Sequence, residues 1–233
     1  MKFKISEQVA EKYPEVNIGV VIVKDADNSL YNEEIQELLR KTEEEMRKKI
    51  DIEKILEVPS VAKWREVYKS FGAKPSDTRN SAEAILRRVL KGGNLPKINC
   101  LVDLYNYISL KYTLTVGGED IDKIEGDLVL DFANGDEEFI AIGSDENKPP
   151  MDGEVVYKDD KGVACRCWNW KEGDRTKLTD KTKNAVLVIE NLIPGEESKF
   201  KEALDELKQL VEKYCNAKCE GVVLNKDNLE VEL

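Results

Sequence analysis

This chain of 233 residues contains no His, so no imidazole is available for catalysis or metal binding. Catalysis by Ser–His–Asp or Cys–His sets, metal sites built on two His residues and an imidazole general base are therefore excluded. Acid–base work must fall to carboxylates, Lys, Tyr, Cys, a group of the substrate, or water.

Two asparagines and a pair of glycines form a first group of candidate site residues. Asn99 stands at a predicted helix start, where its side chain can cap the backbone or point at a ligand. Asn106 lies too far into the same helix to cap it, which favours a polar contact with the loop predicted at Gly117 and Gly118. Consecutive glycines let the backbone approach a ligand closely, as they also do in a plain turn.

A second group combines aromatic area with charge in a segment predicted to be a loop between strands. Its candidates for contact with a substrate are Trp168, Asn169, Asp174, Arg175 and Thr176. Rigid aromatic rings and an Arg that can bind two oxygens at once can stack a base or line an amino-acid pocket. They can equally form a hydrophobic plug with a structural Asp–Arg pair.

The five cysteines offer a weaker possibility, a metal site. Cys165 and Cys167 lie in a predicted strand and would share one of its faces. Cys215 and Cys219 are four residues apart, whereas two zinc-binding cysteines are usually separated by two residues. Small buried hydrophobic side chains explain them better, so neither a metal nor a cofactor is expected. The first residues contain no run suited to a secretory signal, and no membrane span is found, which indicates a cytoplasmic protein with reduced thiols.

Charge is distributed unevenly along the chain. The whole sequence has 36 Lys and Arg against 47 Asp and Glu, a net charge of -11, yet residues 61–112 hold ten bases and four acids. This segregation predicts either a phosphate-binding face on an acidic protein or an ordinary solvated face. The candidates for RNA contact are Arg79, Arg87, Arg88, Lys91 and Lys97.

The elements that must position these residues follow from hydrophobic spacing. A nearly continuous apolar run predicts a strand buried on both faces at 16–24, and helical spacing predicts a helix over 32–56 that breaks near Asp51. Helices are predicted after Ser60, from Ser81 with its hydroxyl as the cap, from Asn99, and over 196–215. Alternation predicts strands at 127–132, 138–142, 154–158, 163–168, 185–190 and 221–224. The expected fold class is α+β, a helical layer on a largely antiparallel sheet or sandwich.

Four stretches together resemble the tRNA-editing B3/B4 domain of the phenylalanyl-tRNA synthetase beta subunit, especially its freestanding relatives. They are SAEAILRRVLK (81–91), LPKINCLVDLYNY (95–107), VGGEDIDKI (116–124) and CRCWNWKEGDRTKLTDKT (165–182). The resemblance implies a single domain with an editing core at 61–192, on which 1–60 and 193–233 pack as additions. It also implies an enzyme that binds the aminoacylated 3′ end of tRNA and hydrolyses the ester of a wrong amino acid.

The same resemblance assigns roles to individual residues. The family's pocket Asn falls on Asn106, its pocket His falls on Gly117, and a pocket Gly falls near Asn169. The family's acidic residue falls near Val188, with Glu190 two residues on and so on the same strand face. Glu119 lies in a matching stretch and is a substrate-contact candidate. We expect the Gly117 and Gly118 amides to stabilise the oxyanion while water attacks. Because Gly117 replaces the His, a module that binds an amino acid or tRNA without hydrolysis is the alternative.

Overall fold

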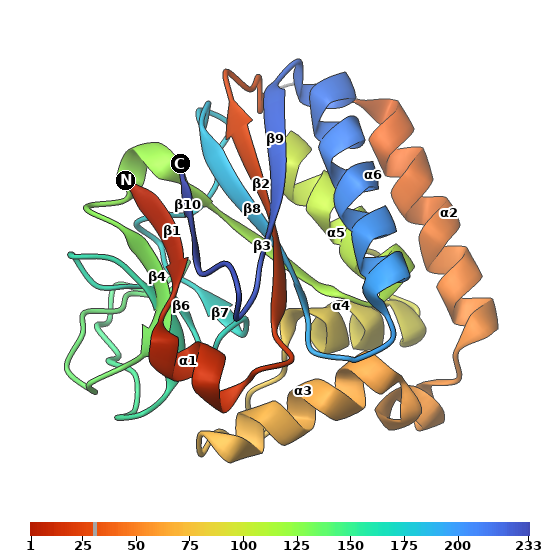
Figure 1. Cartoon of the computed structure of the whole chain (residues 1–233). Helices are drawn as coiled ribbons and strands as arrows, with labels where there is room; N and C mark the ends of the chain where they lie inside the picture. The colour runs from red at the N-terminus through yellow and green to blue at the C-terminus, as the bar shows by residue number, and fades with distance from the viewer. Residues whose placement is uncertain (30–31) are drawn as a thin grey trace.

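Two β-sheets and a helical layer make up residues 1–29 and 32–233, which the computed structural model describes (Figure 1). The helices are α1 (Glu7–Lys12), α2 (Glu33–Lys49), α3 (Pro59–Ser70), α4 (Ser81–Leu90), α5 (Cys100–Tyr112) and α6 (Glu197–Cys215), with 3-10 turns η1 (Ile52–Glu57) and η2 (Ile121–Lys123). The strands are β1 (Lys2–Ile5), β2 (Asn17–Lys24), β3 (Thr115–Asp120), β4 (Leu128–Phe132), β5 (Val155–Lys158), β6 (Val163–Arg166), β7 (Lys171–Glu172), β8 (Ala185–Asn191), β9 (Lys218–Leu224) and β10 (Glu230–Glu232). The α+β prediction is confirmed.

The smaller sheet, in the order β3-β8-β2-β9, separates two hydrophobic cores. On β2, Val21 and Val23 belong to the core beneath α2, α5 and α6, whereas Val20 and Ile22 belong to the core shared with the larger sheet. Because successive strand residues point to opposite faces, a strand with a core on each side must be apolar at nearly every position. The continuous run in β2 therefore follows from its place between two layers.

The larger sheet, in the order β10-β1-β4-β5-β6-β7, packs on the face of the smaller sheet that the helical layer leaves open (Figure 1). All strand pairs are antiparallel except β1 with β4. Side chains of β1, β4, β5 and β6 meet those of β2 and β8 between the sheets. This inter-sheet layer is where the candidate site lies.

Three local predictions are wrong, each for a physical reason. The glycines at 117 and 118 lie within β3 rather than in a loop, because β8 pairs with the whole segment. Residues 138–142 form only isolated bridges, since the Phe139 amide bonds to the Asn147 side chain instead of a neighbouring strand. Helix α4 is capped by Asn80, whose side chain accepts from the Glu83 amide, and not by Ser81.

Candidate functional site

The floor of a small cavity between the sheets is built by one face of β3 and β8. Their register pairs Thr115 with Glu190, Gly117 with Val188 and Glu119 with Val186. These positions alternate with residues that face the helical layer, so they share the inter-sheet face. This pairing places Glu119 and Glu190 in the protein interior, where they are 5% and 1% exposed.

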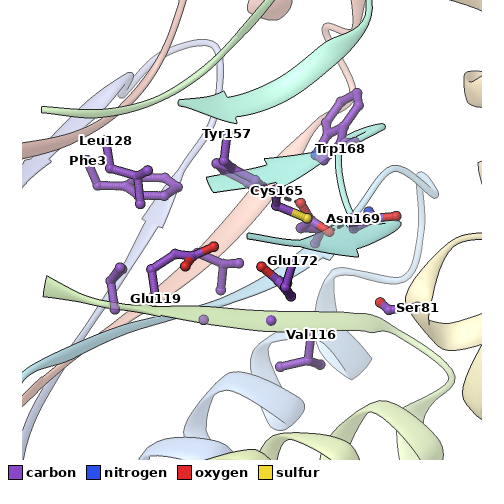
Figure 2. Close-up of a pocket in the computed structure, with 15 residues that line it drawn as sticks. Phe3, Ser81, Val116, Glu119, Leu128, Tyr157, Cys165, Trp168, Asn169 and Glu172 are labelled. Atoms are coloured by element: carbon purple, nitrogen blue, oxygen red, sulfur yellow. Dashed lines mark hydrogen bonds between the residues drawn. The ribbon is translucent and has the colours of Figure 1, made fainter. Parts of the chain in front are cut away.

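The roof is a row of side chains from three neighbouring strands of the larger sheet. Tyr157 on β5 pairs with Cys165 on β6, which pairs with Glu172 on β7. Figure 2 shows the Glu172 side chain directed toward Glu119 and β3, whereas Tyr157 lies beside Cys165. The cavity is also lined by Phe3, Ser81, Val116, Gly118, Leu128, Trp168, Asn169 and the β8 residues. It is a small cavity, with about 20 Å³ in which the centre of a water-sized sphere can lie.

Glu190 is held by a directed chain of hydrogen bonds. The Tyr157 hydroxyl donates to its Oε1 at 2.6 Å, and Asn169 Nδ2 donates to its Oε2 at 2.6 Å. Asn169 Oδ1 in turn accepts from the Tyr68 hydroxyl at 2.9 Å. Burial raises the pKa of Glu190 to about 7, against the hydrogen bonds that lower it. A carboxyl poised near neutral pH and fixed in orientation is suited to general-base work.

Glu119 and Glu172 form a second carboxyl group in the same cavity. Burial and the neighbouring charge of Glu172 raise the pKa of Glu119 well above its usual range, and burial raises the pKa of Glu172. Two carboxyls in one dry site hold a proton between them, because both cannot ionise cheaply. The Oε2 atom of each is buried and makes no hydrogen bond.

These raised pKa values predict an unusual pH dependence of stability. Glu190 binds its proton more tightly in the folded chain, with a pKa about 7, than in the unfolded chain, at 4.5. Its contribution is therefore fully present below pH 4.5 and is lost as pH rises toward 7, a change of roughly 3 kcal/mol. We expect urea titrations to give a higher free energy of unfolding at pH 5.5 than at pH 8. A free energy that rises across this interval would contradict the buried, protonated carboxyls.

A strained turn after β6 brings Trp168 and Asn169 to the cavity. Cys167 and Trp168 both have left-handed backbones, with φ of 45° and 66°. Glu154 stabilises the turn, since it accepts from the Cys167 amide at 2.8 Å and from the Arg166 guanidinium. Trp168 is fully buried and packs edge-to-face on Tyr13 and Trp64. The segment was predicted to be either a substrate-contacting loop or a hydrophobic plug, and Trp168 fits the plug. The one polar atom of its side chain, Nε1, has no hydrogen-bond partner.

Several predicted site residues lie outside the cavity. Asn99 caps α5 through the Val102 amide, because the helix start needs an acceptor there. Asn106 is buried on α5, on the helical side of the smaller sheet, and does not line the cavity. Arg175 binds Asp159 with two hydrogen bonds, and Asp174 pairs with Lys177. None of the four residues lines the cavity, so substrate contact by Asn99, Asp174 and Arg175 and a catalytic role for Asn106 stay predictions.

The remaining candidates are placed close together. Gly117, Gly118, Glu119, Asn169 and Glu190 line the cavity with Trp168, whereas Thr176 is fully buried beside Glu119 without lining it. Sequence reasoning missed Glu172, Tyr157, Cys165 and Ser81 as lining residues. Of these four, Glu172 alone has a feature in the sequence that could have suggested a site residue, because it is an acidic residue directly after the Trp-Asn-Trp motif. An acidic residue is equally common at the solvent-exposed end of a strand, so this feature does not identify a site.

The expected pair of oxyanion amides is also corrected. Successive amides of a strand point to opposite edges, so of Gly117 and Gly118 only one N–H can face away from β8. No strand pairs with the other edge of β3 in the described part of the chain. Backbone stabilisation of an oxyanion at β3 would therefore come from one amide.

The two glycines should respond differently to an added methyl group. A Cβ at Gly118 would lie 2.5 Å from Leu187 Cδ2 and 2.9 Å from the Val186 carbonyl oxygen, whereas one at Gly117 would meet only Glu172 Oε1, at 3.2 Å. We expect Gly118→Ala to lower the free energy of unfolding by about 1–3 kcal/mol, as overpacking does. Gly117→Ala serves as the matched control, with a smaller loss in urea titrations. Equal losses would argue against the close β3–β8 contact.

The basic residues of the helical layer divide into two sets. Glu83 on α4 is fully buried and accepts two hydrogen bonds from Arg65, one from Arg87 at 2.7 Å, and a 3.9 Å ion pair from Arg79. The predicted phosphate contacts of Arg79 and Arg87 are thus at least partly replaced by an internal ion-pair cluster. Arg88, Lys91 and Lys97 are exposed.

Helix α4 connects the cavity to these basic residues. Its first residue, Ser81, lines the cavity, and the Ser81 amide donates to the Asn169 carbonyl at 3.0 Å.

Within residues 1–29 and 32–233, no group of three or more Cys, Asp or Glu side chains is arranged to hold a metal ion. None of the helices described in the structure has the length and apolar character needed to cross a bilayer.

The fold and the cavity define an α+β protein with a carboxyl-lined site between two packed sheets. The sequence profile of the B3/4 domain matches residues 63–216, which include all three cavity glutamates, and the chain belongs to this family. The resemblance found in the sequence is confirmed. No curated protein matches the sequence.

Among solved structures, the chain is similar to an N-terminal fragment of the phenylalanyl-tRNA synthetase beta subunit from Pyrococcus horikoshii. The two chains are 10% identical, with a TM-score of 0.48. The match covers 95% of this chain and 53% of that fragment, so this chain spans about half its length.

Proposed function

We propose that this chain hydrolyses the ester of mischarged aminoacyl-tRNA in trans, as a cytoplasmic enzyme of translation quality control. The observation that carries the proposal is the meeting of Glu190, Asn169 and Gly117 at one buried cavity in a B3/4 family member. The core of this activity is residues 61–192, with the flanking segments packed on it. Phe3 from the N-terminal segment completes the cavity wall.

In this proposal Glu190 is the general base. Its carboxylate takes a proton from a water molecule as that water adds to the ester carbonyl carbon. The bond from that carbon to the ribose oxygen then breaks, and the proton passes to the ribose oxygen. Tyr157 and Asn169 each donate to one oxygen of the carboxylate and so fix its orientation, which supports attack from a defined direction. The edge amide of β3 and Trp168 Nε1 are donors for the developing oxyanion.

The proposal is tested with the purified full chain and a panel of tRNAs, each charged with a labelled amino acid that does not belong to it. We expect release of the amino acid faster than in buffer for at least one member of the panel. Release no faster than in buffer for every member would contradict the proposal.

The tRNA itself is expected to bind along α4, beyond the cavity. Arg88 and Lys91 are exposed there, and phosphate contacts release counterions from the nucleic acid. We expect Arg88→Glu with Lys91→Glu to weaken tRNA binding at low salt by about tenfold or more and to reduce the slope of log affinity against log salt by about one to two.

Filter-binding titrations over a salt series measure both quantities. The matched control is Lys201→Glu with Lys226→Glu, which makes the same charge change at two other exposed positions. Equal effects of the two double variants would show that net charge, and not the α4 face, governs binding.

A binding module without hydrolysis is the second candidate, favoured by Gly117 in the place of the family's pocket His. Such a module would bind a free amino acid saturably and release nothing from aminoacyl-tRNA. Calorimetry with free amino acids, beside the release assay, separates the two functions.

A further inference from the structure

We propose that Glu119 and Glu172 form a subsite for the primary ammonium group of a small amino-acyl head. This inference rests on the proposed function, because it names the chemical class that the same cavity accepts. It assigns a binding role to Glu172, which neither the sequence motifs nor the family resemblance singles out.

The first support is the charge of the cavity. Three carboxyl groups line it, and none of its described lining residues is Lys or Arg. The nearby guanidinium of Arg175 is already bound to Asp159 by two hydrogen bonds. Buried carboxyls are normally matched by a cation or by donors, and a ligand that brings an ammonium group supplies both.

The second support is a set of buried polar atoms without partners. Oε2 of Glu119 and Oε2 of Glu172 are free acceptors, and Trp168 Nε1 is a free donor on a side chain that is fully buried. Ser81 Oγ, on another lining residue, is a fourth such atom. Native proteins leave few such atoms, so four around one cavity indicate a ligand with complementary groups. An ammonium group satisfies the two acceptors, and a carbonyl oxygen satisfies the donor. An amino-acyl head carries both.

The third support is size. The cavity has about 20 Å³ for the centre of a water-sized sphere. Its walls are fixed, because Phe3 and Trp168 are fully buried and Tyr157 is bonded to Glu190. A Cβ at Gly117 would already approach Glu172 Oε1 to 3.2 Å, so the ammonium end has little spare room. The cavity therefore fits a head with a side chain as small as that of glycine, alanine or serine, and excludes an aromatic ring.

The test compares three soluble probes by calorimetry on the intact chain at pH 7.5. Alaninamide carries the ammonium and the carbonyl, N-acetylalaninamide lacks the charge, and tyrosinamide adds an aromatic ring. We expect saturable binding of alaninamide and at least tenfold weaker binding of the other two. No saturation by alaninamide up to about 10 mM, or binding of either other probe as tight as that of alaninamide, would overturn the proposal.

Variants locate the subsite. Glu172→Gln keeps the shape and removes the charge, and we expect it to weaken alaninamide binding at least tenfold. Glu220→Gln makes the same chemical change at an exposed position of β9 and should leave binding unchanged. Wild-type affinity in Glu172→Gln would place the ammonium elsewhere. Circular dichroism checks folding, and the probe comparison on the wild-type chain decides the matter even if the variant does not fold.

The outcome is separable from that of the deacylase proposal. Alaninamide binding without release from any charged tRNA would uphold the subsite and contradict hydrolysis. Release from charged tRNA with no preference for small amino acids would uphold hydrolysis and contradict the subsite.

Discussion

Replacing Glu190 by glutamine is expected to slow deacylation of the best aminoacyl-tRNA substrate by about 100- to 10,000-fold. The change removes the proton acceptor while it keeps the shape of the side chain. The glutamine oxygen can still accept from Asn169 Nδ2, which donates to Glu190 at 2.6 Å, and the glutamine NH₂ can donate to the Tyr157 hydroxyl, which can also accept. Single-turnover release of labelled amino acid measures the loss.

The pH profile of the wild-type chain provides an independent reading of the same residue. A general base acts in its ionised form, and the pKa of Glu190 is about 7 because of burial. We therefore expect the rate to fall about tenfold per pH unit below 7 and to level above it. Glu220→Gln is the control for loss of one negative charge. A Glu190→Gln rate within a few-fold of wild type, with the same pH profile, would exclude Glu190 as the base.

Replacing Glu83 by alanine is expected to lower the free energy of unfolding by about 3 kcal/mol. Glu83 is fully buried and receives the guanidinium groups of Arg65 and Arg87. Removing the carboxylate leaves these charges without their partner inside a half-buried cluster. The Arg65 and Arg87 side chains are 23% and 24% exposed, so water recovers part of the loss, and the expected value lies at the lower end for a broken buried pair.

Urea titrations followed by circular dichroism measure this effect. Glu66→Ala, at an exposed position of the neighbouring helix α3, is the matched control and should change stability by less than about 0.5 kcal/mol. The Glu83→Ala variant should not bind tRNA more weakly per folded molecule, because it frees arginines rather than removing them. Stability equal to that of Glu66→Ala would show that the Glu83 cluster is not a structural centre.

The elements of this fold could be predicted where one physical rule acts alone. The continuous apolar run of β2 and the amphipathic spacing of α6 are set by burial on two faces and on one face, and the predicted boundaries of both elements lie within one residue of the observed ones. The predicted start of β9, at residue 221, is three residues late. The break at Asp51 was predicted as well, and it coincides with the cap of η1. Local hydrogen bonding overrode the pattern at 138–142, where a side chain took the place of a strand partner.

The candidate site could be predicted only in part, because it is assembled across two sheets. Glu190 and Asn169 entered through the resemblance, and Glu119 through a matching stretch. Glu172 could not be assigned, since its burial depends on β7 joining the edge of the larger sheet over β3, which local spacing does not encode. Asn106 shows the converse: its helical position was read correctly, but α5 lies behind the smaller sheet and the residue does not line the cavity.

The position of the acyl group is the central claim, and a crystal structure with a stable substrate analogue tests it most directly. The analogue is adenosine whose ribose carries alanine through a 3′ amide, which water does not cleave readily. We predict electron density for the alanyl group between the two sheets, with its ammonium at Glu119 and Glu172, its carbonyl oxygen at Trp168 Nε1 and its carbonyl carbon on the side of Glu190. Density for the analogue at another surface, with the cavity closed and unchanged, would contradict the account.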